Sequence, residues 1–195
     1  MIIRNPRHSV RKTPEKPSGF RAEQLMEEHM RGKRLDTTHI PLINRALTHD
    51  ASNVRARGID ALMKVTDPQK SEKLVWMLED PDWFVKVKAS EALGTMKEKA
   101  ALPALIGLLK NTNCYVRSAA ADALGEIGSG KAIPALERIA ILGERPELNA
   151  EKKEKGFVIR SARLALKKLD APEYHCMMGM TAEDRAEMIE FGHGP

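Results

Sequence analysis

The sequence has few aromatic residues, which make up 4% of its 195 positions. Strands are enriched in aromatic and β-branched residues, so this composition argues against a fold built on sheets. Charged residues make up 30% of the chain, and alanine and leucine are frequent. These residue types favour helices packed through small and aliphatic side chains. We therefore expect an all-α fold.

Cysteine is also scarce, since Cys114 and Cys176 are the only two in the sequence. Their contexts do not resemble a disulfide framework, so we expect free thiols, no disulfide and a reducing compartment. No apolar run reaches the length of a membrane-spanning helix, and Arg4 and Arg7 interrupt the start of the sequence where a secretion signal needs apolar residues. These features predict a cytoplasmic protein without membrane insertion.

The charge is unevenly distributed along a chain whose net charge is +5. Residues 1–19 contain five basic residues and one acidic residue, whereas residues 171–195 contain one basic and five acidic residues, so the two ends carry +4 and −4. We expect residues 1–17, which are rich in proline and basic side chains, to form an extended arm. We expect residues 171–195 to form an acidic tail with a short helix.

A period of 31 residues organises the middle of the chain, most clearly at Val54, Val85 and Val116. Small residues follow four and seven positions later and leucine follows at the eighth, which places these columns on one face of a helix. A fourth copy begins at Val158 after an insertion of 11 residues. The small and leucine columns contain Gly58, Ala89, Ala120 and Ala162; Ala61, Ala92, Ala123 and Ala165; and Leu62, Leu93, Leu124 and Leu166.

A second helix in each unit repeats with the same period. Ile43, Leu74, Leu105 and Leu136 are spaced 31 apart. Pro41, Pro103 and Pro134 share another column and mark helix starts, because a proline in the first turn gives up only an amide that lacks a partner there. Helix pairs that cannot bury their own apolar faces must stack on their neighbours, which predicts a solenoid.

The segment from Val116 to Gly125, which reads VRSAAADALG, resembles the HEAT-like repeats of the phycobilisome-lyase type. The resemblance spans about residues 40–169 and implies a short right-handed α-solenoid of about four to five HEAT-like helix pairs. The period is shorter than the roughly 40–47 residues usual for HEAT units. In that family a loop aspartate, here retained only as Asp80, and an arginine six residues later tie adjacent repeats together. The resemblance therefore implies structural roles for Arg55, Lys86 and Arg117.

These observations predict three parts: the arm at 1–17, the solenoid at 18–170 and the tail at 171–195. A helix at 18–32, capped by Ser18, is expected to cover the first repeat, because an uncovered end would leave apolar surface in water. A helix beginning at Thr181 could dock on Leu166 and Leu169. The repeat units are expected near 38–48, 52–79, 83–110, 114–142 and 150–169.

No residue pattern points firmly to catalysis, a cofactor or a metal. The segment from Gly125 to Lys131 has the spacing of a phosphate-binding loop but joins two helices and ends in Ala132. His175, Cys176 and Met178 could bind a soft metal but match no firm metal motif. Iron-dependent hydroxylases built from HEAT-like repeats carry His-Glu pairs, which this sequence does not contain. We expect a chain that is not an enzyme, with no catalytic, cofactor-binding or metal residues.

The remaining function is binding. We expect a non-catalytic scaffold, adaptor or assembly factor that docks on a larger protein complex through its concave face and charged termini. The second helices conventionally line the concave side, and tryptophan and arginine are favoured anchors in interfaces. The candidate partner-binding residues are Arg45, Trp76, Glu79, Trp83, Lys110 and Arg138, together with Arg4, Arg7, Arg11 and Lys12 of the arm.

Two alternatives stay open. The basic arm and the basic stretch at 152–163 could attach the chain to RNA or a ribonucleoprotein through phosphate contacts. A tetrapyrrole or bilin lyase-like chaperone is the second alternative, because relatives of this repeat handle tetrapyrroles. Four partial repeats form a short surface for that task.

Overall fold

The computed structural model describes residues 35–142 and 152–170. Every regular element in these two ranges is a helix, as the composition predicts. The predicted arm, the capping helix at 18–32, the acidic tail and the docking of that tail on Leu166 and Leu169 involve residues outside the described ranges. The α-helices are α2 (Ile40–Leu47), α3 (Ser52–Lys64), α4 (Lys70–Met77), α5 (Trp83–Thr95), α6 (Leu102–Leu108), α7 (Cys114–Ile127), α8 (Ile133–Leu142) and α9 (Lys152–Lys168), with short 3₁₀ turns at Thr37–His39, Lys99–Ala101 and Gly130–Ala132.

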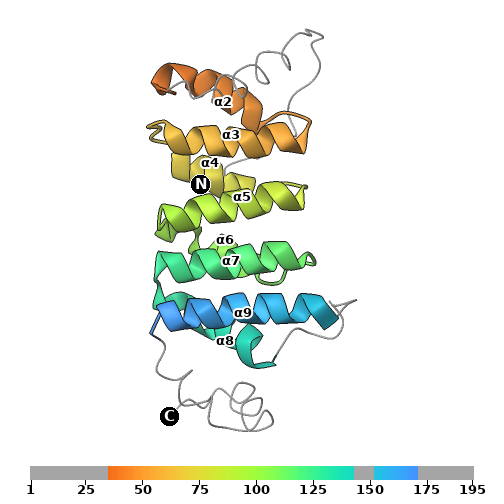
Figure 1. Cartoon of the computed structure of the whole chain (residues 1–195). Coiled ribbons are helices and arrows are strands. Elements are labelled where there is room, and N and C mark those ends of the chain that lie inside the picture. The colour runs from red at the N-terminus through yellow and green to blue at the C-terminus, as the bar shows by residue number, and fades with distance from the viewer. Residues whose placement is uncertain (1–34, 143–151, 171–195) are drawn as a thin grey trace.

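The helices form a two-layered stack (Figure 1). Helices α3, α5, α7 and α9 lie side by side in one layer, and α4, α6 and α8 lie behind them. Helices α3, α5 and α7 begin 31 residues apart, which is the period of the sequence. Residues at equivalent positions of the repeats therefore come next to one another, although they are far apart along the chain.

Local sequence signals set the ends of these helices. Asp82 and Asn113 precede α5 and α7, and their side chains accept hydrogen bonds from the backbone N–H of Phe84 and Tyr115. Such caps satisfy amides that have no partner within the helix. Pro41 and Pro103 lie in the first turns of α2 and α6, as predicted. Gly128 ends α7 with φ of 73°, a left-handed conformation that glycine adopts without steric cost.

Small residues allow close approach between neighbouring helices of the first layer. A Cβ atom added to Gly94 of α5 would lie 2.9 Å from the Cα of Ala123, and one added to Gly125 of α7 would lie 2.8 Å from the Cα of Ala165. Leucines fill the remaining space between the layers, and Leu93, Leu124 and Leu166 are fully buried. The result is one continuous core of buried residues.

The two layers differ in how extensively their own helices contact one another. Each of α3, α5, α7 and α9 packs closely on the next, whereas α4, α6 and α8 make far fewer contacts with one another. The expectation that the second helices line the concave side stays a prediction.

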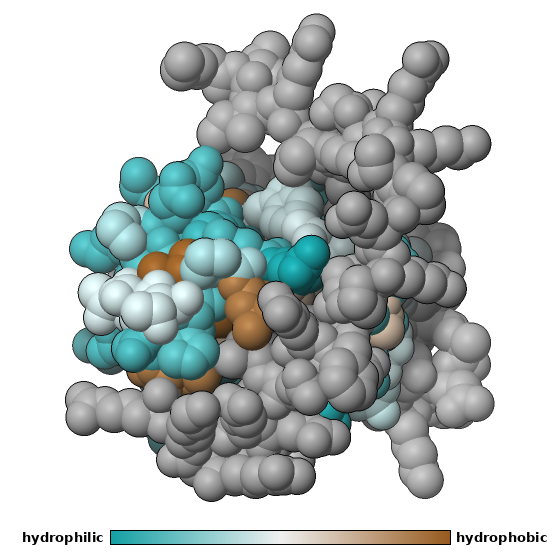
Figure 2. Space-filling model, turned by 90° about the horizontal axis from the view of Figure 1, so that it is seen from above, coloured by the Kyte–Doolittle hydropathy of each residue, from teal (hydrophilic) through white to brown (hydrophobic). Residues whose placement is uncertain are grey.

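Viewed down the stack from the α2 end, the described surface is mainly hydrophilic, with small apolar patches (Figure 2). None of the described helices combines the length and the apolar character that crossing a bilayer requires. Cys114 is buried and forms no disulfide with another described residue. Cys176 lies outside the described residues.

We predict that Gly125→Ala destabilises the fold by about 1–3 kcal/mol, because the new methyl group meets backbone of α9 that cannot move freely. Gly107→Ala is the matched control, since nothing lies within 4 Å of a Cβ atom there. That change should leave stability unchanged or raise it by up to about 1 kcal/mol, because alanine favours helix. Urea denaturation followed by circular dichroism measures both effects. A Gly125→Ala variant as stable as the parent would contradict the close-approach argument.

Candidate protein-binding surface

Four exposed aromatic side chains form a row across α5, α7 and α9. Trp83, Phe84, Tyr115 and Phe157 are 44%, 41%, 55% and 50% exposed. Trp83 contacts both Phe84 and Tyr115, at ring-centroid distances of 5.8 and 5.3 Å, and Tyr115 contacts Phe157 at 6.3 Å. We call these four residues the aromatic ridge. They are half of the eight aromatic residues in the sequence.

The ridge is a consequence of the repeat. Phe84 and Tyr115 are 31 residues apart, and Phe157 follows 42 residues later, after the 11-residue insertion, so all three occupy one column. This column immediately precedes the buried valines Val85, Val116 and Val158. Asn53 occupies the same position on α3, so the aromatic character of the column begins at α5.

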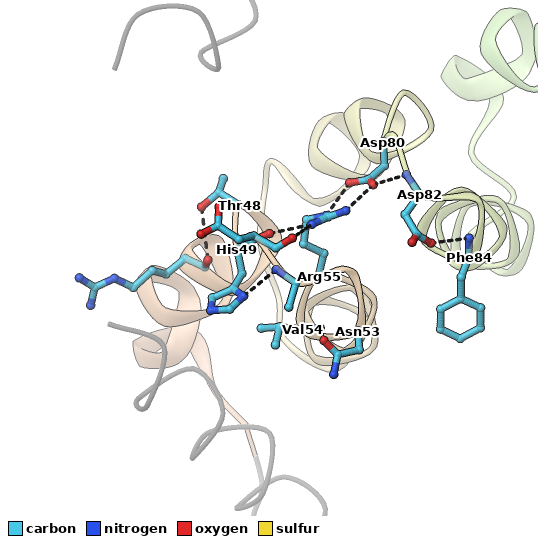
Figure 3. Close-up of polar contacts among 11 residues, drawn as sticks. Thr48, His49, Asn53, Val54, Arg55, Asp80, Asp82 and Phe84 are labelled. Atoms are coloured by element: carbon cyan, nitrogen blue, oxygen red, sulfur yellow. Dashed lines mark hydrogen bonds and ion pairs between the residues drawn. The ribbon is translucent and has the colours of Figure 1, made fainter. Parts of the chain in front are cut away.

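A chain of polar contacts fixes the backbone that carries the first part of the ridge (Figure 3). The Arg55 guanidinium donates from Nε and Nη2 to the two carboxylate oxygens of Asp80, each at 2.8 Å. Asp80 Oδ1 accepts from the N–H of Asp82 at 2.9 Å, and Asp82 Oδ1 accepts from the N–H of Phe84 at 2.8 Å. The start of α5, which carries Trp83 and Phe84, is therefore held by a buried ion pair with α3.

Arg55 also holds its own turn, because its Nη1 donates to the carbonyl oxygens of His49 and Asp50 at 2.8 and 2.7 Å. One side chain thus joins the turn before α3 to the turn before α5. The predicted tie between adjacent repeats is confirmed for Arg55 and Asp80, whereas the structural role expected for Lys86 stays a prediction. A bidentate pair of this kind repays the cost of desolvating both charges only when its geometry is good and its remaining donors are satisfied.

The turn before α7 repeats this arrangement with an amide in place of the carboxylate. Asn111 Oδ1 accepts from the N–H of Asn113, and Asn113 Oδ1 accepts from the N–H of Tyr115, both at 2.9 Å. Arg117 Nη1 donates to the carbonyl oxygens of Asn111 and Thr112 at 2.7 and 2.9 Å. Tyr115 is therefore positioned by the same kind of turn as Phe84.

Charged residues lie on the same helices as the ridge. Lys88 of α5 lies 3.5 Å from Asp60 of α3 and 3.8 Å from Glu91 of its own helix. Asp122 of α7 accepts a hydrogen bond from Ser161 of α9 at 3.3 Å. Desolvation raises the pKa of the Asp122 carboxyl. The hydroxyl of Ser161 also forms a buried hydrogen bond with the hydroxyl of Ser118, with 2.6 Å between the two oxygens.

Of the predicted partner-binding residues, Trp83 belongs to the ridge. Trp76 is half-buried and packs against the core. Arg45, Glu79, Lys110 and Arg138 are exposed, and they lie on α2 and α8 or in the turns after α4 and α6. Their role in binding stays a prediction. Arg4, Arg7, Arg11 and Lys12 lie outside the described residues.

The structure gives the phosphate-loop-like segment a helical role. Gly125 lies within α7 and packs against α9. Gly128 ends α7, and Lys131 lies in the 3₁₀ turn that leads to α8. In the part of the chain that the structure describes, no three His, Cys, Asp or Glu side chains gather as metal ligands would. The His175, Cys176 and Met178 group lies outside that part.

We predict that Arg55→Met or Asp80→Asn alone lowers the free energy of unfolding by about 3–5 kcal/mol, because each leaves a buried partner without its counter-charge. The double variant should lose less than the sum of the two. Lys168→Ala, which removes an exposed pair with Glu126, is the control and should cost less than about 1 kcal/mol. Urea denaturation of the four variants tests this. Additive losses at Arg55 and Asp80 would argue against the coupling.

The raised pKa of Asp122 gives a pH-dependent prediction. A carboxyl whose pKa is higher in the folded state contributes stability below its unfolded pKa, near 3.8, and loses that contribution as pH rises through the folded pKa. Asp122→Asn should therefore stabilise the fold at pH 7 by a few tenths of a kcal/mol, and less as pH approaches 4. Urea denaturation at both pH values measures the difference. A variant less stable than the parent at pH 7 would contradict this sign.

Comparison with known proteins agrees with the architecture. Residues 71–151 match the family model described as HEAT repeats, which supports a HEAT-like repeat protein. Among solved structures, human deoxyhypusine hydroxylase in complex with glycerol is similar, with a TM-score of 0.53 and 22% identity over 71% of this chain and 44% of that one. The chain thus spans less than half the length of that protein. A search of curated proteins found no match.

At this identity the similarity shows the fold alone, and it confirms the predicted all-α solenoid. It also corrects one expectation. The sequence led us to expect that the chain is not an enzyme, but a protein that shares its fold is itself named as a hydroxylase. HEAT-like repeats are therefore compatible with catalysis and are no evidence against it.

Proposed function

We propose that this chain is a protein-binding scaffold and that the aromatic ridge is its main contact with a partner protein. The observation that carries the proposal is the exposure of Trp83, Phe84, Tyr115 and Phe157 as one connected apolar row. Connected apolar surface of this kind marks interaction sites on proteins, whereas single exposed apolar residues need no explanation. Solenoids of stacked helix pairs commonly bind partners along such extended faces.

The ridge suits binding because it is held in place before a partner arrives. The capped turns fix the starts of α5 and α7, and the rings pack edge to face or tilted against each other. Preorganised side chains lose less conformational freedom on binding, so more of the burial free energy appears as affinity. Tryptophan and tyrosine are also among the residues that most often dominate binding energy.

A role as adaptor or assembly factor on a larger complex is the extension of this proposal. In it the ridge supplies the apolar centre, and exposed charges such as Arg45, Lys110 and Arg138 supply the rim, where charges set orientation and association rate. The RNA alternative rests on basic residues of the arm. The RNA alternative predicts binding that weakens steeply as the salt concentration rises. Binding through an aromatic-centred interface is less sensitive to salt.

The test compares three tagged proteins in parallel captures from the native host, followed by mass spectrometry. The parent chain and Leu164→Ala should retain the same partner, whereas Tyr115→Ala combined with Phe157→Ala should lose it. Leu164 is the matched control because it is a 48% exposed apolar residue on α9 that is not part of the ridge. Loss of two hot-spot aromatics typically weakens binding by about 30-fold or more.

Denaturation of the same proteins separates binding from folding. Because both aromatic side chains are half exposed, the double variant should keep a midpoint close to that of the parent. Equal recovery of the partner by the parent and the ridge variant would overturn the proposal. Recovery of nucleic acid that disappears at high salt would favour the RNA alternative instead.

A further inference from the structure

The last described helix, α9, ends the stack with a basic face. In α7, the positions that face the next helix hold Ser118, Ala121 and Gly125, and two of these are in direct contact with α9. The equivalent positions of α9, 42 residues later, hold Arg160, Arg163 and Lys167. Three small residues that admit a neighbour are thus replaced by three long cationic side chains.

These three side chains share one side of α9, because spacings of three and four residues bring side chains together on a helix. All three are exposed. Arg163 extends toward α8 and donates to the carbonyl oxygen of Ala140 at 3.4 Å. Within residues 35–142 and 152–170, no carboxylate pairs with any of the three, whereas Lys168 on the adjacent side pairs with Glu126. We call Arg160, Arg163 and Lys167 the basic end face.

We propose that the basic end face binds the acidic C-terminal segment of the same chain, residues 171–195. That segment carries five acidic residues and one basic residue, and four of the acidic residues lie between 183 and 190. The opposite charge of the two surfaces is the first argument. Charge attraction of this kind extends over about 8–10 Å at physiological salt.

The position of the segment in the chain is the second argument. It begins directly after Asp170, and Arg160 precedes Asp170 by ten residues, or about 15 Å of helix. The 12 residues between Asp170 and Glu183 can span about 40 Å when extended, so the acidic group can return along the whole face. A short tether also gives the segment a high effective concentration at this face, in the millimolar range.

Coverage of the end has a structural purpose. The side of a terminal helix that would face a further repeat could accept a second copy of the chain, so solenoids cover such ends with polar residues. Three cations that pair with no carboxylate among the described residues disfavour stacking of another copy by repulsion, and an acidic segment laid over them neutralises their charge. This contact concerns a different surface from the aromatic ridge, so either proposal can fail without the other.

The experiment uses the cysteine that the segment itself contains. Cys176 is labelled with a nitroxide in the full chain, while Cys114 is buried and only 7% exposed. Mass spectrometry verifies a single label. In a ¹⁵N-labelled sample at low salt, amide signals along α9 should lose most of their intensity relative to the reduced nitroxide. That loss should largely disappear in 0.5 M salt, because exposed charges are screened there.

The charge-reversed variant Arg160→Glu, Arg163→Glu, Lys167→Glu should abolish the loss. The matched control, Arg57→Glu with Lys64→Glu, reverses two exposed cations of α3 and should leave it unchanged. Unaltered α9 signals in the parent chain, or a loss that survives charge reversal, would overturn the proposal. A sample mixing nitroxide-labelled ¹⁴N chain with unlabelled ¹⁵N chain should show no loss. A loss there would overturn the intrachain contact in favour of a second copy.

Discussion

The close approach of helices through glycine and alanine is the constraint on which the rest of this structure depends. Gly94 and Gly125 bring α5, α7 and α9 within backbone contact of their neighbours. This distance places residues of the same column side by side. The rings of Trp83, Tyr115 and Phe157 meet across these closely packed helices. A shared interior and a continuous surface row therefore have one cause.

The polar turns complement this packing. Apolar contact along a helix permits sliding, because it is largely non-directional. The hydrogen bonds between Arg55 and Asp80 are directional, and Arg55 joins the turn before α3 to the turn before α5. It thereby specifies how far α5 is displaced along α3. In the next turn Asn111 replaces the carboxylate, so the turn geometry is retained without a second buried negative charge.

The sequence predicted the fold well because the fold is a repetition. Columns such as Val54, Val85 and Val116 recur at every copy, and buried positions admit few residue types. The ridge was only partly predicted, through Trp83. Its column is exposed, begins with Asn53 and is shifted by the insertion before Phe157, so it lacks the regularity that marks a core position. Catalysis was excluded wrongly, because chemistry does not follow from a repeat pattern.

The insertion between α8 and α9 shows how such a chain can change. It adds 11 residues to the repeat, yet α9 packs on α7 with its small column in phase and Phe157 reaches Tyr115. Lengthening a connection costs little free energy, since closure entropy grows only with the logarithm of loop length. Evolution can thus extend this connection, and engineers can insert a tag or a second domain there, while the helices on either side keep their register.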